Sequence, residues 1–301
     1  MTPPLVALLY AAVGTIGITA NCLIFVVVAR NRAVEPEPFG RPFFRLVSNV
    51  ALTDIVVLVT FVVVPVPYIA MQRDLSDVYT SVVANLSTVA FNALVLQMLL
   101  LSFNRFCTVL AGLKTTVNEY RFVRCCIEHA GSTWIQFGAW MLAALAVVSL
   151  ELIDGCEITF THTQPTYVFT CEGETGYFYQ LFAYFHYLVP VVIFTLYLIL
   201  YVLLMKFRNR IETDGKQLTS EEEQRRRRAQ RERSLMLQAT VISTCYLLNC
   251  YAFYEFPKLH SWIGPVATAM ACILNSSVNP FIYWTFSSIV RQKTMQLVLC
   301  K

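Results

Sequence analysis

Charged residues are scarce in this chain of 301 residues. Asp, Glu, Lys and Arg make up only 14% of it, against about 25% in an ordinary soluble domain. The 10 cysteines are scattered, without the Cys-x-x-Cys pairs or Cys/His spacing typical of a metal site. Glycine-rich phosphate loops and Gly-x-Ser-x-Gly nucleophile motifs are also absent. The sequence therefore provides no support for a metal site, a bound cofactor or an enzyme.

Long apolar runs are abundant instead, and 56% of the residues are hydrophobic. A helix needs about 20 mostly apolar residues to cross the hydrocarbon core of a bilayer. Backbone groups in lipid must bond to one another, so such runs are expected to be helical. We predict an all-α membrane protein, a seven-helix bundle with a short C-terminal helix, forming one domain over residues 1–301. The expected spans are residues 5–29, 43–71, 82–110, 133–152, 177–207, 235–256 and 261–286.

The distribution of basic residues predicts the orientation of the chain. Of its 23 Lys and Arg residues, only Arg73 and Lys258 lie on one side of the spans, and only Arg105 lies well inside a span. All the others lie on the opposite side, which the positive-inside rule makes cytoplasmic. An odd number of spans then places the N-terminus outside and the C-terminus in the cytoplasm. The basic run 225–228 lies between two spans, so we interpret it as a charged helical extension and not as a nucleic-acid site.

Two charged residues, Asp54 and Arg105, lie well inside the predicted spans. A charge at membrane depth costs at least about 2.5 kcal/mol, so it indicates a function unless the side chain reaches water. Arg105 is close to the end of its span, where a long side chain can extend to the membrane surface. Asp54 is near the middle of its span and has a short side chain, so it must face a polar interior.

The seventh predicted span supplies polar side chains for that interior. Its residues 275–283 are unusually polar for a helix in lipid, and Pro280 frees backbone carbonyls that nearby polar groups must satisfy. Each isolated polar residue could by itself be ordinary contact between helices. We predict instead that they meet in one buried, hydrated network of Asn21, Asp54, Asn275, Asn279, Pro280 and Tyr283.

These positions resemble the signature positions of rhodopsin-like (class A) G-protein-coupled receptors. The matching motifs are Asn21, Asn-Val-Ala-Leu-Thr-Asp at 49–54, Asn-Arg-Phe at 104–106 and Asn-Pro-Phe-Ile-Tyr at 279–283. Each motif is weak alone, but the set covers the whole chain in the expected order. The Asn-Arg-Phe motif and the loop between Cys156 and Cys171 are also similar to those of nematode serpentine chemoreceptors, class x among them.

The resemblance implies a receptor at the plasma membrane. It would convert binding of an extracellular, chemosensory small molecule into activation of a heterotrimeric G protein. The polar network would relay the change, and Asn104 and Arg105 would form the coupling switch. A neuropeptide receptor of the same class remains an alternative. A membrane transporter is a further alternative, although it would need more ionisable residues along a path, or repeated halves.

The chain departs from the receptor pattern at several positions. Asn104 replaces the acid that normally precedes the arginine, and Thr80 stands where the third-span cysteine would be. The sixth span lacks the Cys-Trp-x-Pro switch. Asp54 corresponds to the sodium-binding acid of the family, but Leu94 replaces a serine of that site, which leaves sodium binding open. The activation details of the family therefore cannot simply be carried over.

The outer segment from Cys156 to Cys171 alternates apolar residues with a strand period. Folding it about a turn at 163–166 brings the two cysteines opposite each other. In an oxidising outer compartment this registry favours a disulfide, with two free thiols as the alternative. The cross-strand pairs expected from this fold are Ile158 with Phe169 and Phe160 with Tyr167.

Ligands commonly bind between the helices of a bundle. Four residues in the outer half of the third span share one helical face, and residues of the fifth and sixth spans lie at a comparable depth. Packing alone explains each of them about equally well, so the prediction rests on the cluster and not on one member. The candidate ligand-binding residues are Ser87, Thr88, Phe91, Asn92, His186, Tyr251 and Tyr254.

Overall fold

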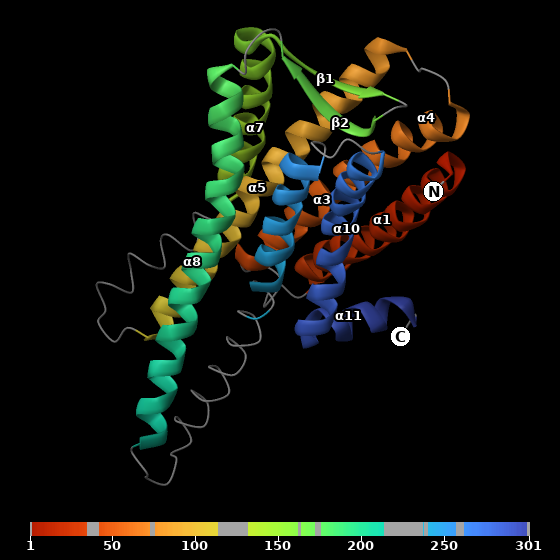
Figure 1. The fold of residues 1–301 in the computed structure, drawn as a ribbon. Coiled ribbons are helices and arrows are strands. Elements are labelled where there is room, and N and C mark those ends of the chain that lie inside the picture. Colours follow the sequence, from red (N-terminus) through yellow and green to blue (C-terminus); the bar gives the residue numbers. More distant parts are fainter. Residues whose placement is uncertain are drawn as a thin grey trace.

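The computed structural model describes residues 2–34, 42–72, 76–113, 132–161, 164–171, 176–213, 237, 240–256 and 262–299. Six helices in these ranges are long and apolar enough to cross a membrane, counting α3 and α4 together. The helices, shown in Figure 1, are α1 (Pro3–Val34), α3 (Pro42–Val63), α4 (Pro65–Met71), α5 (Asp77–Leu113), α7 (Thr133–Asp154), α8 (Tyr177–Thr213) and α10 (Ile263–Phe286).

These helices correspond to six of the seven predicted spans, and most of them extend beyond the predicted limits. The sixth predicted span, 235–256, is helical over residues 240–255, and most of its start lies outside the described residues. The short C-terminal helix is α11 (Ser288–Val298). Ser287 ends α10 and begins α11, because its Oγ accepts a 3.3 Å hydrogen bond from the backbone N–H of Val290.

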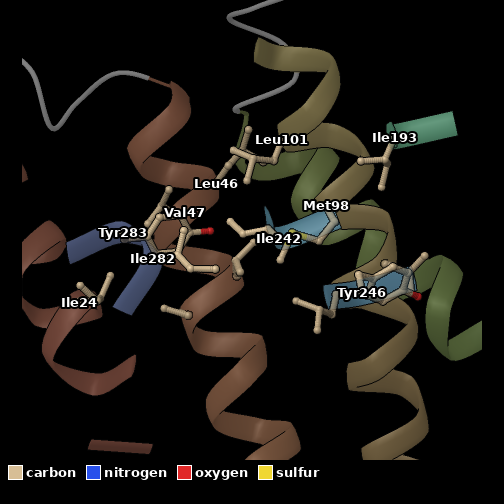
Figure 2. Packing of buried hydrophobic residues seen from close by; sticks show 14 of the residues in the cluster. Ile24, Leu46, Val47, Met98, Leu101, Ile193, Ile242, Tyr246, Ile282 and Tyr283 are labelled. Atoms are coloured by element: carbon tan, nitrogen blue, oxygen red, sulfur yellow. The ribbon is translucent and has the colours of Figure 1, made fainter. Parts of the chain in front are cut away.

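Apolar side chains from several helices meet in the interior of the bundle. Figure 2 shows Val47 of α3, Met98 of α5 and Ile282 of α10 gathered around Ile242 of the 240–255 segment. The outer surface is apolar as well, and Trp134 of α7 is 84% exposed. Large exposed apolar side chains would be a liability in water, but they suit a helix that faces lipid.

Proline interrupts the second predicted span. Val64 separates α3 from α4, and it is followed by Pro65 and Pro67. Proline has no N–H to donate, so the regular helical hydrogen bonds fail at this point. The bond from the N–H of Val64 to the carbonyl of Thr60 is long, at 3.4 Å. The same carbonyl accepts a 3.0 Å hydrogen bond from the hydroxyl of Tyr167, which comes from the outer hairpin.

The predicted hairpin is present, with the predicted register. Strands β1 (Cys156–Thr161) and β2 (Gln164–Cys171) are antiparallel and pair Ile158 with Phe169 and Phe160 with Tyr167. The predicted extent of the turn, 163–166, is wrong, because β2 already begins at Gln164, which pairs with Thr161. The register shifts there, which accommodates Pro165 within a strand.

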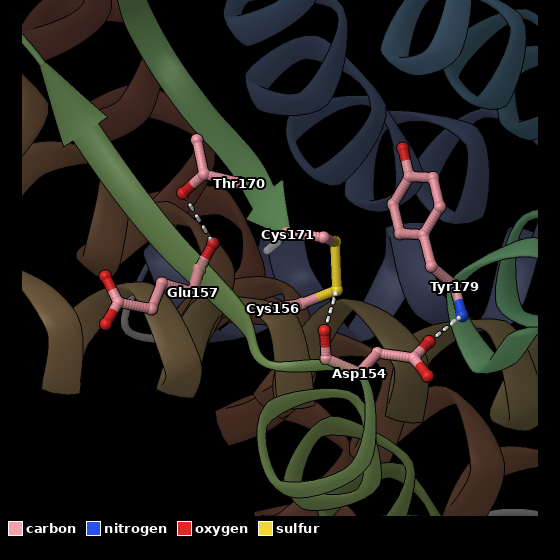
Figure 3. Close-up of a disulfide and its surroundings, with 6 residues drawn as sticks. All are labelled: Asp154, Cys156, Glu157, Thr170, Cys171 and Tyr179. Atoms are coloured by element: carbon pink, nitrogen blue, oxygen red, sulfur yellow. Dashed lines mark hydrogen bonds between the residues drawn. A yellow bond between two sulfur atoms is a disulfide. The ribbon is translucent and has the colours of Figure 1, made fainter. Parts of the chain in front are cut away.

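The predicted disulfide closes the base of the hairpin. Cys156 and Cys171 are bonded, with an S–S distance of 2.04 Å (Figure 3). Gly155, between α7 and β1, has a φ of 58°, in the left-handed region that glycine adopts without strain. Figure 3 also shows that Oδ2 of Asp154 accepts a 2.7 Å hydrogen bond from the backbone N–H of Tyr179. This carboxylate therefore caps the first turn of α8 and fixes it to the end of α7.

Candidate functional site

Asp54 of α3 is fully buried and joins α3 to α10. Its Oδ2 accepts a 2.8 Å hydrogen bond from Nδ2 of Asn279. A polar group without such a bond would be costly at this depth. The structure thus brings together two predicted network residues that are far apart in the sequence.

Asn21 of α1 completes a second link to α10. Because Pro280 has no N–H, the carbonyl of Ser276, one turn earlier, has no helical donor. Nδ2 of Asn21 donates to that carbonyl at 2.9 Å and to the carbonyl of Gly17 in its own helix at 3.0 Å. The side chain of α1 therefore satisfies the backbone group that the proline frees, and α1, α3 and α10 are held together.

Two further predicted network residues lie on the same face of α10 as Asn279. Asn275 and Tyr283 are one helical turn before and after it, and both are buried. The hydroxyl of Tyr283 has no hydrogen-bond partner among the described residues. They flank the bonded core of the network without a direct hydrogen bond to Asp54 in the described part of the chain.

One polar pair beside this network was not expected from the sequence. The Oγ1 of Thr53 donates a 3.0 Å hydrogen bond to Oε1 of Gln97, and both residues are fully buried. This bond joins α3 to α5. The sequence did offer one sign of this pair, because Gln97 is the single amide within the apolar run 93–101.

Close packing of α1 depends on glycine. A Cβ atom added to Gly17 would lie 2.9 Å from Cδ1 of Leu58 and 2.9 Å from Cβ of Ser277. Real Cβ contacts are essentially never this short. Small residues commonly let membrane helices approach this closely. Gly17 therefore determines how near Asn21 comes to the backbone of α10.

A second feature is a cavity of about 30 Å³ beneath the hairpin. Its walls come from α3, α5, α8, α10 and residues 240–255, and β2 contributes Tyr167 and Phe169. This volume has room for about two water molecules and is far below the ~300 Å³ of a typical ligand pocket. Five of the predicted ligand-binding residues line it: Ser87, Thr88, Phe91, His186 and Tyr254.

The other two predicted ligand-binding residues lie elsewhere. Asn92 is buried but does not line the cavity, and its Nδ2 donates to the carbonyl of Thr88 at 2.7 Å within α5. Tyr251 is 54% exposed, with its ring against Phe256. The rotation of the 240–255 helix about its axis places Phe253, and not Tyr251, on the side that lines the cavity. Helical spacing alone did not fix that rotation.

His186 lies at the centre of an aromatic cluster. Its ring is nearly parallel to that of Phe91, at 8° and a centroid distance of 5.6 Å. Nδ1 lies 2.8 Å from the carbonyl of Phe182 and donates to it. Nε2 of His186 and the hydroxyl of Tyr254 are both buried without a hydrogen-bond partner among the described residues. Two residues of this largely aromatic wall therefore each carry a polar atom without a partner in the described part of the chain.

The hairpin is bonded to the wall of this cavity. The carbonyl of Thr60 accepts a hydrogen bond from the hydroxyl of Tyr167. The Oγ1 of Thr60 in turn donates to Oγ of Ser87 at 2.9 Å. Burial raises the pKa of the Tyr167 hydroxyl, which keeps it a proton donor. The hairpin is therefore linked by hydrogen bonds to α3 and, through Thr60, to α5.

Arg105, near the other end of α5, packs on an aromatic ring. Its Cζ lies 3.4 Å from the centroid of the Phe43 ring, a cation–π contact with α3. Arg105 is largely buried, and Asn104 beside it is almost fully buried. Sequence analysis identified the arginine but not the phenylalanine, because nothing in the sequence brings residue 43 next to residue 105.

The chain is similar to a known protein family and to a solved structure. A family model described as "Serpentine type 7TM GPCR chemoreceptor Srx" matches residues 12–287. A crystal structure of squid rhodopsin is similar over 99% of this chain and 85% of that chain, with a TM-score of 0.74 and 13% sequence identity. At this identity the likeness concerns the fold alone, and it confirms the predicted rhodopsin-like helix bundle.

Proposed function

We infer the function of this chain from its family: it belongs to the Srx family of serpentine seven-transmembrane G-protein-coupled chemoreceptors. It is therefore a multi-pass membrane receptor and not an enzyme. We propose that its ligand is an extracellular small molecule that binds in the cavity beneath the hairpin. Binding would activate a heterotrimeric G protein at the opposite end of the bundle. From the basic residues, we propose a plasma-membrane orientation with the N-terminus outside.

The observation that best supports this proposal is that the cavity and the polar network share two helices. Val57 of α3 and Cys272 of α10 line the cavity. Asp54 lies about one turn from Val57 in α3, and Ser276 lies one turn beyond Cys272 in α10. A ligand that separates or rotates α3 and α10 would therefore act directly on the bond between Asp54 and Asn279. Binding would shift the population toward one packing of the bundle.

We propose Asn104 and Arg105 as the coupling switch. Because asparagine occupies the position of the usual acid, the guanidinium is held in part by its contact with Phe43. A cation–π contact contributes about 0.5–2 kcal/mol, depending on how far it is desolvated. Loss of this contact would be one step in turning the arginine toward a G protein.

The alternatives are less well supported. A neuropeptide would need a wide open mouth, whereas the hairpin lies across the cavity and the cavity is about 30 Å³. A transporter is not suggested by the family to which the chain belongs. A small-molecule receptor therefore remains the proposal.

The experiment is a screen of small molecules on cells that express the receptor with a G-protein dissociation sensor. Thr88→Phe, which fills the cavity, should abolish the response to any active compound while surface expression is retained. Thr244→Phe is the matched control, because Thr244 lies on the exposed face of the 240–255 helix. An undiminished response in Thr88→Phe would show that the ligand binds elsewhere.

A further inference from the structure

The wall of the cavity also indicates the chemical class of the ligand. We propose that the ligand is an uncharged, planar, ring-containing molecule with one hydrogen-bonding group, such as a small aromatic alcohol, bound to His186 and Tyr254. This inference rests on the proposed function only in taking the cavity as the ligand site. It does not depend on coupling to a G protein.

Charged residues do not line the cavity in the part of the chain that the structure describes. None of its lining residues there is Asp, Glu, Lys or Arg. A buried ion without a counter-charge is strongly unfavourable, because it loses its hydration without compensation. The described acids nearby are engaged elsewhere or exposed: Asp154 is bonded to the first turn of α8, Glu157 is exposed on β1, and Oε1 of Glu255 accepts a 3.5 Å hydrogen bond from the Tyr187 hydroxyl. The cavity is therefore suited to a neutral molecule.

The aromatic rings favour a flat partner. Phe91 faces His186 at an interplanar angle of 8° and Phe253 at 20°, with centroid distances of 5.6 and 6.2 Å. Rings in this arrangement present parallel faces, on which another planar ring can stack or offset. A saturated ring of the same size has no π face and gains only its apolar burial.

The two polar atoms require a hydrogen-bonding group on the ligand. Since Nδ1 of His186 donates to the carbonyl of Phe182, the neutral ring leaves Nε2 as an acceptor. The ring centroids of His186 and Tyr254 are 6.2 Å apart. A single ligand hydroxyl can donate to Nε2 and accept from the Tyr254 hydroxyl. It would thereby satisfy both buried atoms that have no partner in the described part of the chain.

The size of the cavity limits the ligand further. At about 30 Å³ it must enlarge to admit even one ring. Side-chain rotations at a binding site are common, whereas large backbone movements are less so. The enlargement is achieved most simply by turning one of the stacked rings, so the ligand is small.

The test uses the full chain in lipid nanodiscs and five matched probes: benzyl alcohol, toluene, cyclohexylmethanol, benzylammonium and benzoate. Binding is measured as the concentration-dependent rise in melting temperature. Benzyl alcohol should bind most tightly. Toluene, which lacks the hydroxyl, should bind about five- to hundredfold more weakly, because both hydrogen bonds are lost. Cyclohexylmethanol should also bind more weakly, and the two ions should not stabilise the protein.

Two variants assign the hydrogen bond. Tyr254→Phe removes only the hydroxyl, so it should weaken the binding of benzyl alcohol about two- to tenfold and leave the binding of toluene unchanged. Tyr251→Phe makes the same substitution on the exposed face of the 240–255 helix, so it should change the binding of neither probe. Thr88→Phe should remove all binding, which distinguishes the cavity from probe dissolved in lipid.

Several results would overturn the ligand class. One is that either ion stabilises the protein as strongly as benzyl alcohol does. Another is that Tyr254→Phe weakens the binding of toluene and of benzyl alcohol equally. The others are that benzyl alcohol stabilises Thr88→Phe as much as the wild type, or that no probe stabilises the protein. The proposed signalling function fails separately. If the probes bind as expected but no compound activates a G protein, the ligand class stands and the coupling proposal does not.

Discussion

Replacing Gly17 by alanine tests whether contact between α1 and its neighbours holds the bundle together. The new methyl group would lie 2.9 Å from Cδ1 of Leu58 and 2.9 Å from Cβ of Ser277, and still closer to Oγ of Ser277. The helix α1 must move away, which also draws Asn21 from the carbonyl of Ser276. The same substitution at Gly138 of α7 meets nothing within 4 Å and serves as the matched control.

The magnitude follows from two opposing effects. Alanine is favoured over glycine in a helix interior by up to about 1 kcal/mol, and this gain applies at both positions. Overpacking costs about 1–3 kcal/mol, and this applies only at Gly17. Comparing the two variants cancels the gain. Gly17→Ala should therefore be about 1–3 kcal/mol less stable than Gly138→Ala.

The assay is thermal inactivation of the purified receptor in nanodiscs, with equal heating rates because membrane proteins commonly unfold irreversibly. Gly17→Ala should inactivate at a lower temperature than the wild type, and Gly138→Ala at the same or a higher temperature. Adding Ser277→Ala removes one of the clashing atoms and should restore part of the loss. Equal stability of the two alanine variants would refute the packing argument.

Three further predictions follow from the same contacts, all measured by thermal inactivation. Tyr167→Phe should cost about 1 kcal/mol, because it removes the bond from the hairpin to α3 but keeps the ring; no loss would show that this bond does not hold the hairpin. Replacing both Cys156 and Cys171 by serine should cost about 3 kcal/mol; a double variant as stable as the wild type under oxidising conditions would contradict this. Asn279→Ala should cost about 1–3 kcal/mol, because it removes the hydrogen bond to Oδ2 of the buried Asp54; a neutral effect would argue against the network.

The features that the sequence predicted well are those encoded locally or by strong physical constraints. Long apolar runs can only be helices in lipid, so six spans and the helical part of the sixth-span prediction could be located. Alternating residues fixed the register of the hairpin and hence the pairing of Cys156 with Cys171. Pro280 indicated a freed carbonyl in α10, and the structure shows Asn21 bonded to it.

The features that sequence analysis missed depend on how helices are rotated against one another. Helical spacing suggested Tyr251, but the packed helix turns Phe253 into the cavity. The contact of Phe43 with Arg105 and the bond of Tyr167 to α3 join residues of different elements. Such pairs are set by packing of the whole bundle, and a single sequence carries no local pattern for them.

The central claim is that a ligand in the cavity activates a G protein through the bundle. The most direct measurement is ligand-stimulated nucleotide exchange on purified heterotrimeric G protein, with wild-type receptor and Arg105→Ala in nanodiscs and ligand binding measured in parallel. The account predicts that Arg105→Ala binds ligand like the wild type but no longer stimulates exchange. Equal stimulation by both proteins, or ligand binding without any exchange in the wild type, would contradict it.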